Sequence, residues 1–305
     1  MLRIDDFHHC PSHLDLHRAI RYDAMRLPYW IKTKHFTGLH STKQILRSHG
    51  ISTVCEQARC PNIGHCFSKP TATFLILGPR CTRQCGFCSV DSASLPLDPP
   101  SADEPGRVAR TAQEMGLKYV VITSVTRDDL PDGGALHFAH TIKALKDVLP
   151  DAGIEVLIPD FKGDIGALKI VLHSEPDVVN HNVETVPRLY SLVRPQADYG
   201  LSLYVLKMAK KQAPHIRIKS GVMVGLGETF EEIVSVMKDL SSAGCDFLTI
   251  GQYLRPSKRN LPVVEYVAPG TFIDYKETAL RMGFKGVASS PLVRSSMNAE
   301  EMFLS

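Results

Sequence analysis

The sequence predicts an α/β fold: a partial (β/α)6 barrel of the TIM type whose rim is capped by N-terminal and C-terminal extensions. The prediction comes from six short segments that are apolar on both faces, helical segments between them, and polar residues that follow them. Parallel strands buried on both faces have continuous apolar sequences, and repeated strand–helix units build either a doubly wound sheet or a barrel. Polar groups just after the strands favour the barrel, because barrel enzymes carry their sites at that rim.

The predicted strands and helices alternate along the middle of the chain. The strands are 72–77, 119–125, 154–159, 177–182, 216–225 and 247–250. The helices are 42–50, 105–115, 135–148, 165–173, 200–211, 230–243 and 272–282, several of which end at a glycine. We therefore expect an N-terminal extension over 1–70, the barrel over 71–254 and a C-terminal extension that closes the site over 255–305.

The composition limits the class of protein. The 305 residues are 44% apolar and 22% charged, which suffices for a large core, and the formal net charge of +3 is too small to indicate a nucleic-acid partner. No apolar run reaches membrane-spanning length, so no membrane association is expected. The first residues lack a secretory pattern and include acids, so we expect a cytoplasmic location. Clustered cysteines there are metal ligands more often than disulfides.

A cysteine triplet follows the first predicted strand in the pattern C-x3-C-x2-C: Cys81, Cys85 and Cys88. Three thiolates within eight residues can hold an iron–sulfur cube and leave its fourth iron open for a substrate or cofactor. Gly86 permits a tight turn between two ligands, and Phe87 is placed to shield the site or pack on a cofactor. A structural zinc site is the alternative, but it normally requires four ligands.

A second triplet, Cys55, Cys60 and Cys66, precedes the first strand in the pattern C-x4-C-x5-C. Turn-forming residues between these cysteines allow the chain to fold them around one metal centre. Three thiolates again leave one iron to be ligated by another group. His65 is a candidate, although a lone His beside a Cys is more often a neighbour of such a site than a ligand.

The first of these motifs resembles that of the radical S-adenosylmethionine superfamily, because an aromatic residue precedes the last cysteine and the motif follows the first strand of a strand–helix repeat. The resemblance implies that the open iron chelates the amino and carboxylate groups of the methionine moiety. One electron from the cluster then cleaves the cofactor to give a 5′-deoxyadenosyl radical. In this class the cofactor carries the chemistry, and the protein positions and protects it.

The two motifs together, C-E-x-A-R-C-P-N-I-x-x-C and C-T-R-x-C-x-F-C, resemble the lipoyl synthase family closely. The resemblance covers nearly the whole chain and includes 123–130, 178–186, 219–228, 249–254 and 291–296. It implies two 4Fe–4S clusters, the second held by the N-terminal triplet and by a serine of the C-terminal Arg-Ser-Ser motif. That serine maps to Ser296, with Ser295 as the fallback. A hard oxygen ligand on iron is more easily displaced than a thiolate, which suits a cluster that is taken apart.

The family resemblance also implies a reaction and partners. The substrate is an octanoyl chain on a lysine of a lipoyl carrier domain, in 2-oxoacid dehydrogenase acyltransferase subunits or the glycine cleavage carrier protein. Two radicals remove hydrogens from carbons six and eight, and the second cluster is consumed as the sulfur donor. A flavodoxin or ferredoxin type electron donor and a cluster-repair protein are expected. Two alternatives stay open: an auxiliary cluster that only transfers electrons, and a non-catalytic iron–sulfur redox sensor.

Two further groups of residues are candidates for the site. The catalytic candidates are charged residues after the second strand and beside the serine pair: Arg127, Asp128, Asp129 and Arg294. The cofactor-binding candidates are Phe87, Asn182, Glu184, Arg194, Gly225, Gly227 and Glu228. Structural roles are the alternatives, because buried charges need partners of their own and a G-x-G segment also fits a tight strand–helix turn.

The chain departs from the family pattern at a few positions near its C-terminal face. Met297 and Asn298 follow the two serines in place of Tyr and a small basic residue or His. Ser290 replaces a Gly before Pro, and Asn260 replaces a His. These changes leave the expected metal ligands intact and concern contacts to the substrate.

Overall fold

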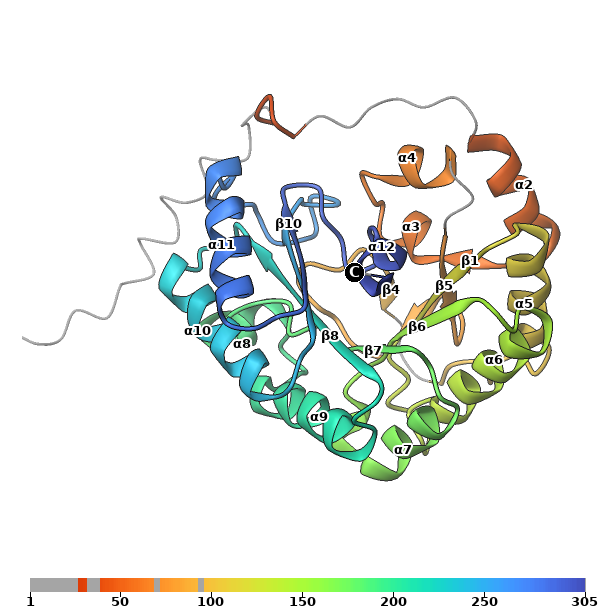
Figure 1. Ribbon diagram of the computed structural model, residues 1–305. Helices are drawn as coiled ribbons and strands as arrows, with labels where there is room; N and C mark the ends of the chain where they lie inside the picture. Colours follow the sequence, from red (N-terminus) through yellow and green to blue (C-terminus); the bar gives the residue numbers. More distant parts are fainter. Residues whose placement is uncertain (1–26, 32–38, 69–71, 93–95, 305) are drawn as a thin grey trace, which may run out of the picture.

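The fold is an open, mostly parallel barrel in which helices cover the outside of one curved sheet (Figure 1). The computed structural model describes residues 27–31, 39–68, 72–92 and 96–304. The strand order is β1-β2-β5-β6-β7-β8-β9-β10. Only the pairing of β1 with β2 is antiparallel, and no pairing between described residues joins β1 to β10. The expected partial barrel is therefore confirmed.

All six predicted strands are present, and their bounds differ from the predicted ones by at most two residues. They are β2 (Thr73–Ile76), β5 (Tyr119–Ser124), β6 (Gly153–Leu157), β7 (Val178–Asn180), β8 (Arg217–Val224) and β9 (Phe247–Gln252). Their central residues are buried on both faces. That burial is the reason for their continuous apolar sequences.

The predicted helices are present as well. They are α2 (Leu39–Ser48), α5 (Glu104–Glu114), α6 (Ala135–Val148), α7 (Ile165–His173), α9 (Tyr199–Gln212), α10 (Phe230–Ser242) and α11 (Pro269–Arg281). Local sequence sets their starts: Asp164 accepts hydrogen bonds from the first turn of α7, and Thr229 forms a capping box with Glu232 at α10. No helix in the described ranges is long and apolar enough to cross a membrane.

Two strands of the sheet are absent from the sequence prediction. β10 (Gly286–Ser290) lies parallel to β9, with Gly286 opposite Phe247 and Ser290 opposite Gly251. Its last three residues are only half-buried and include two serines, so it lacks the apolar pattern of the other strands. β1 (Ser52–Thr53) is too short to give a pattern. The segment after 255 therefore contributes one strand, β10, to the sheet.

After β10 the chain returns through the middle of the fold and ends in α12 (Ala299–Leu304), which Figure 1 shows near the centre of the barrel. Met302 packs with Phe247, and the Phe303 ring lies 5.8 Å from that of Tyr119. Phe247 and Tyr119 are the first residues of their strands. The C-terminal segment thus runs from the rim where the strands end to the opposite end of the barrel.

Candidate active site

The loop after β2 brings the C-x3-C-x2-C cysteines to the rim of the barrel. Cys81 ends the short strand β3 (Arg80–Cys81), and its Sγ accepts hydrogen bonds from the backbone N–H groups of Arg83 at 3.4 Å and Thr126 at 3.3 Å. The Cys88 N–H donates to the Cys85 carbonyl at 3.1 Å. Burial raises the pKa of Cys85 and raises that of Cys88 to about 12, and the neighbouring cysteines add to both shifts. We call Cys81, Cys85 and Cys88 the radical set.

Two backbone hydrogen bonds hold the turn inside the radical set, one to the N–H and one to the carbonyl of Gly86. The Gly86 N–H donates to the Val193 carbonyl at 2.9 Å, and the Leu261 N–H donates to the Gly86 carbonyl at 2.9 Å. A Cβ at Gly86 would lie 2.8 Å from Leu261 Cδ1 and 3.1 Å from the Leu192 carbonyl oxygen. Close packing therefore requires this glycine. Phe87 is partly buried and packs against the core.

Asn260, one of the departures from the family pattern, holds the radical set from the C-terminal side. Its side-chain amide is buried and donates to the Cys88 carbonyl at 2.8 Å. Its Oδ1 accepts from Ser257 Oγ at 2.7 Å, and its backbone carbonyl accepts from Arg255 Nε at 2.8 Å. The short Asn side chain is thus fixed by its own loop against the loop that carries the cysteines.

Replacing Asn260 with alanine should loosen the radical set, because the buried Cys88 carbonyl would lose a partner at a cost of about 1–3 kcal/mol. We expect chelators to remove iron from the Asn260→Ala protein faster than from the unmodified protein, followed by the decay of visible absorbance. Lys258→Ala, in the same loop but exposed, is the control. Equal rates of iron loss in both variants would contradict this role.

A buried arginine between the cysteines fastens the radical set to two neighbouring rim loops. Arg83 Nε lies 2.7 Å from an oxygen of Asp128, and Arg83 Nη1 lies 2.6 Å from an oxygen of Asp160. Its Nη2 donates to both carboxylates, at 2.9 and 2.7 Å. Burial alone would raise the pKa of Asp160, but the hydrogen bonds and charge of Arg83 outweigh it and lower that pKa to about 2. Arg83 was not among the predicted site residues, although a charge between two expected metal ligands was a signal for it.

Arg127 and Asp129, two further catalytic candidates, also have partners within the protein. Arg127 is buried and donates to Asp129 at 2.7 Å. It also donates to the carbonyls of Leu77 at 3.3 Å and Asp98 at 3.0 Å. These bonds supply the partners that buried charges need. The catalytic roles of Arg127, Asp128 and Asp129 stay predictions.

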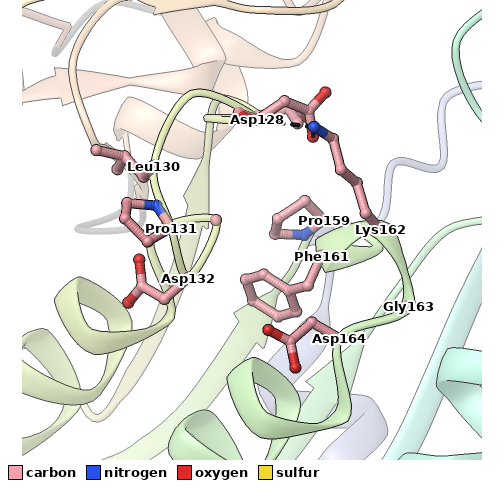
Figure 2. Close-up of a pocket in the computed structure, with 11 residues that line it drawn as sticks. Asp128, Leu130, Pro131, Asp132, Pro159, Phe161, Lys162, Gly163 and Asp164 are labelled. Atoms are coloured by element: carbon pink, nitrogen blue, oxygen red, sulfur yellow. Dashed lines mark hydrogen bonds and ion pairs between the residues drawn. The ribbon is translucent and has the colours of Figure 1, made fainter.

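An open pocket of about 400 Å³ lies beside this network, between the loops that follow β5 and β6. Figure 2 shows Asp128 and Lys162 at one end of it, Asp132 and Asp164 at the other, and apolar side chains between them. Phe161 and Lys162 have φ values of +46° and +51°, a left-handed conformation that is uncommon for such residues. The Asp132 and Asp164 carboxylates accept hydrogen bonds from backbone N–H groups at the starts of α6 and α7.

The residues after β7 form a buried polar group next to the radical set. Asn182 Nδ2 donates to Glu184 at 3.0 Å, and Arg194 Nη1 donates to the Asn182 carbonyl at 3.0 Å. Burial raises the pKa of Glu184, whose φ is +67°. The charges of Arg194 and Glu184 both act on the pKa of Cys85. The buried Arg194 Nε has no hydrogen-bond partner among the described residues, so this group retains a free donor.

The G-x-G segment after β8 forms a tight turn. Gly225 and Gly227 have φ values of +103° and +106°, which favour glycine. The N–H groups of Gly225 and Leu226 donate to the Glu228 carboxylate, and a Cβ at Gly225 would overlap Gln252. The amides of Gly225 and Leu226 are therefore satisfied by Glu228. A role of this turn in cofactor binding stays a prediction.

The second cysteine triplet meets the C-terminal serine pair. Cys55 lies in α3 (Val54–Gln57), Cys66 lies in α4 (Ile63–Ser68), and Cys60 lies between these helices. Burial raises the pKa of Cys55 to about 12, hydrogen bonds from Thr73 lower it, and the charges of Cys60 and Cys66 raise it further. Thr73 Oγ1 also donates to Ser296 Oγ at 2.8 Å. We call Cys55, Cys60 and Cys66 the auxiliary set.

Further contacts join the auxiliary set to the Arg-Ser-Ser segment. Asn62 Nδ2 donates to the Leu292 carbonyl at 2.6 Å and to Met297 Sδ at 3.5 Å. Burial lowers the pKa of Arg294, and the charge of Cys60 opposes that shift. The Met297 departure from the family pattern is thus a contact to the loop between two auxiliary cysteines.

Each donor set consists of three cysteines, and Cys thiolates are the usual ligands of iron–sulfur clusters. No disulfide joins two of the described cysteines. Among described residues, no three His, Cys, Asp or Glu side chains are grouped as one metal ion requires. A four-iron cube gives each thiolate its own iron, so its ligands stand further apart than the ligands of one zinc ion. Metal binding would also displace the protons that burial keeps on Cys55, Cys85 and Cys88, whose pKa values it raises.

Comparisons with known proteins agree with this geometry. The model of the family described as Radical SAM superfamily matches residues 75–240. A protein of Alkaliphilus metalliredigens named lipoyl synthase is 54% identical over 279 residues, which cover 90% of this chain and 95% of that protein. A lipoyl synthase of Burkholderia pseudomallei is 51% identical over 287 residues, covering 93% and 87%. The structure of Streptococcus suis SuiB bound to precursor peptide SuiA has a similar fold, with a TM-score of 0.56 at 11% identity, over 94% of this chain and 61% of that one.

Proposed function

The chain belongs to the lipoyl synthase family of radical S-adenosylmethionine enzymes, and we propose that it inserts two sulfur atoms at carbons six and eight of a protein-bound octanoyl-lysine. Membership confirms the resemblance found in the sequence. It makes the protein a sulfurtransferase that uses a 4Fe–4S cluster and S-adenosylmethionine. The proposal adds a second 4Fe–4S cluster as the sulfur donor.

The observation that carries the proposal is the link, through Thr73, between Ser296 and Cys55 of the auxiliary set. Thr73 hydrogen-bonds both the Cys55 thiol and the Ser296 hydroxyl, although Thr73 and Ser296 are 223 residues apart in the sequence. A hydroxyl that shares a partner with one of three clustered cysteines could supply the fourth ligand of a cube. Because oxygen binds iron less firmly than a thiolate does in such a site, this ligand suits a cluster that gives up its sulfur.

The residues divide into two sites that act on one substrate. The radical set would hold the cluster that cleaves the cofactor, and Asn182, Glu184 and Arg194 would bind the amino-acid part of S-adenosylmethionine. When bound, S-adenosylmethionine and its cluster would supply the radical that takes each hydrogen. The auxiliary cluster would supply the sulfide and accept, on iron, the electron that each new C–S bond releases. The residues around Phe87 and Leu261 exclude water, which protects the reaction from side products.

The partners follow from the substrate. We propose that octanoylated lipoyl domains of 2-oxoacid dehydrogenase acyltransferase subunits and the glycine cleavage carrier protein dock at the rim. A flavodoxin or ferredoxin type protein would supply electrons, and a repair protein would rebuild the consumed cluster. The net charge of +3 supports neither nucleic acid nor a charged membrane surface as a partner.

A peptide assay tests the function. Reconstituted protein should hold about eight irons, which is one 4Fe–4S cube for each triplet. With reductant, S-adenosylmethionine and an octanoyl-lysine peptide, it should give 5′-deoxyadenosine and a peptide that carries two new sulfur atoms. 5′-Deoxyadenosine without sulfur transfer would favour an auxiliary cluster that only transfers electrons. Neither product would favour a redox sensor.

Replacing Ser296 with cysteine should preserve the auxiliary cluster but slow its consumption, because a thiolate is held more firmly by iron than a serine oxygen. We expect the same iron content and at least tenfold slower sulfur insertion, roughly the effect of 1.4 kcal/mol on a barrier. Ser289→Ala, which removes a hydroxyl bonded to the Phe272 carbonyl, is the control. Undiminished sulfur insertion by Ser296→Cys would contradict the displaceable-ligand role.

A further inference from the structure

Ser295, the neighbour of the proposed ligand, is bonded to the proposed cofactor site. Its Oγ donates to Asn182 Oδ1 at 2.7 Å, and Asn182 Nδ2 donates to Glu184 at 3.0 Å. Both ends of the Asn182 amide are therefore held. On the basis of the function proposed above, we propose that Ser295 is a positioning residue that couples S-adenosylmethionine binding to the state of the auxiliary set.

A glycine in β8 leaves room for the hydrogen bond between Ser295 and Asn182. Gly221 lies inside β8, where glycine weakens a strand and marks a close approach of another group. A Cβ at Gly221 would lie 2.8 Å from Asn182 Oδ1, 3.1 Å from Ser295 Oγ and 2.6 Å from Thr249 Oγ1. The absence of a side chain at Gly221 leaves room for the two hydrogen-bonded groups. A larger residue there would crowd the contact between the C-terminal segment and Asn182.

Ser295 and Ser296 are consecutive residues, so a movement of one is passed directly to the other. Ser295 and Ser296 are adjacent, so their Cα atoms are about 3.8 Å apart. Ser296 bonds Thr73 beside the auxiliary set, while Ser295 bonds Asn182 beside the radical set. A shift of Ser296 when the auxiliary cluster is consumed would move Ser295 away from Asn182. Cofactor binding would then weaken once the sulfur donor is spent, so that radicals form more slowly at a limiting concentration of S-adenosylmethionine.

Binding measurements test the coupling without relying on catalysis. The Kd of S-adenosylmethionine is measured by equilibrium dialysis on reconstituted protein with and without Ser295→Ala. Each form is then compared with the same form after disruption of the auxiliary set. One disruption combines Cys55→Ala, Cys60→Ala and Cys66→Ala, and a second uses Ser296→Ala alone. We expect Ser295→Ala to raise the Kd about fivefold, the effect of one net hydrogen bond.

The Kd values of these four forms make a double-mutant cycle, and the way the two changes combine tests the proposal. Disruption of the auxiliary set should raise the Kd by a similar factor in the Ser295 protein and leave it unchanged in the Ser295→Ala protein. An unchanged Kd in Ser295→Ala, or an equal rise in both backgrounds, would overturn the coupling. Ser289→Ala should bind as the unmodified protein does. Failure of sulfur insertion in the peptide assay would overturn the proposed function alone, because the Kd cycle does not use sulfur transfer.

Discussion

Replacing Cys60 with alanine should abolish sulfur insertion while 5′-deoxyadenosine still forms, and replacing Cys85 with alanine should abolish both. The radical set and the auxiliary set lie on different segments, so each can lose its metal without the other. Cys85 belongs to the loop after β2, whereas Cys60 lies before that strand. We expect iron content to fall from about eight to about four in each variant, with the two products measured by mass spectrometry.

Cys245 provides the matched control for this comparison. It is buried, its pKa is raised by burial, and it lies in the turn after α10. Cys245→Ala should keep about eight irons and both products. If Cys60→Ala also lost 5′-deoxyadenosine while keeping the iron of the radical set, the two sets would not have separate roles.

Replacing Arg83 with methionine should destabilise the protein by about 3–5 kcal/mol, because it leaves the buried Asp160 carboxylate without its cation. The partly exposed Asp128 carboxylate loses the same partner. The Arg83 side chain is 6% exposed and that of Asp160 is 1% exposed. Chemical unfolding of the metal-free protein measures the change in the free energy of unfolding. Arg188→Met removes a more exposed pair with Glu232 and should cost about 0–1 kcal/mol.

The Arg83 effect should depend on pH in a defined direction. In the folded protein the pKa of Asp160 is lowered from 3.8 to about 2. A lowered carboxyl pKa stabilises the folded state above the unfolded value and loses that contribution as the pH falls through the folded value. The difference in unfolding free energy between the unmodified protein and Arg83→Met should therefore be largest above about pH 4 and shrink toward pH 2. A difference that is constant over this range would contradict the ion-pair account.

The sequence predicted the parts of the fold that have a strong periodic pattern. The six inner strands are buried on both faces, so each has a continuous apolar sequence. β10 was missed because its serines face a half-buried environment and the strand is defined by pairing with β9, a contact between distant segments. The return of the chain to α12 was missed for the same reason, since Phe303 meets Tyr119 only in the folded protein.

The candidate site was predictable to a similar extent. Spacing singled out the six cysteines, and the family resemblance added Ser296. Thr73 and Asn62 were not singled out, because a buried hydrogen-bond partner leaves no pattern in one sequence. Arg83 was missed although its charge stands between two expected metal ligands. These residues connect segments that lie far apart in the sequence, and their contacts exist only in the folded protein.

Isotope labelling tests the central claim that the auxiliary cluster is the sulfur donor. The protein is reconstituted with 34S-sulfide, freed of excess sulfide, and allowed to react with the octanoyl-lysine peptide in the presence of unlabelled sulfide. Our account predicts that both sulfur atoms of the product carry the label and that each protein makes at most one lipoyl group. A product with unlabelled sulfur, or several labelled products from each protein, would contradict the account.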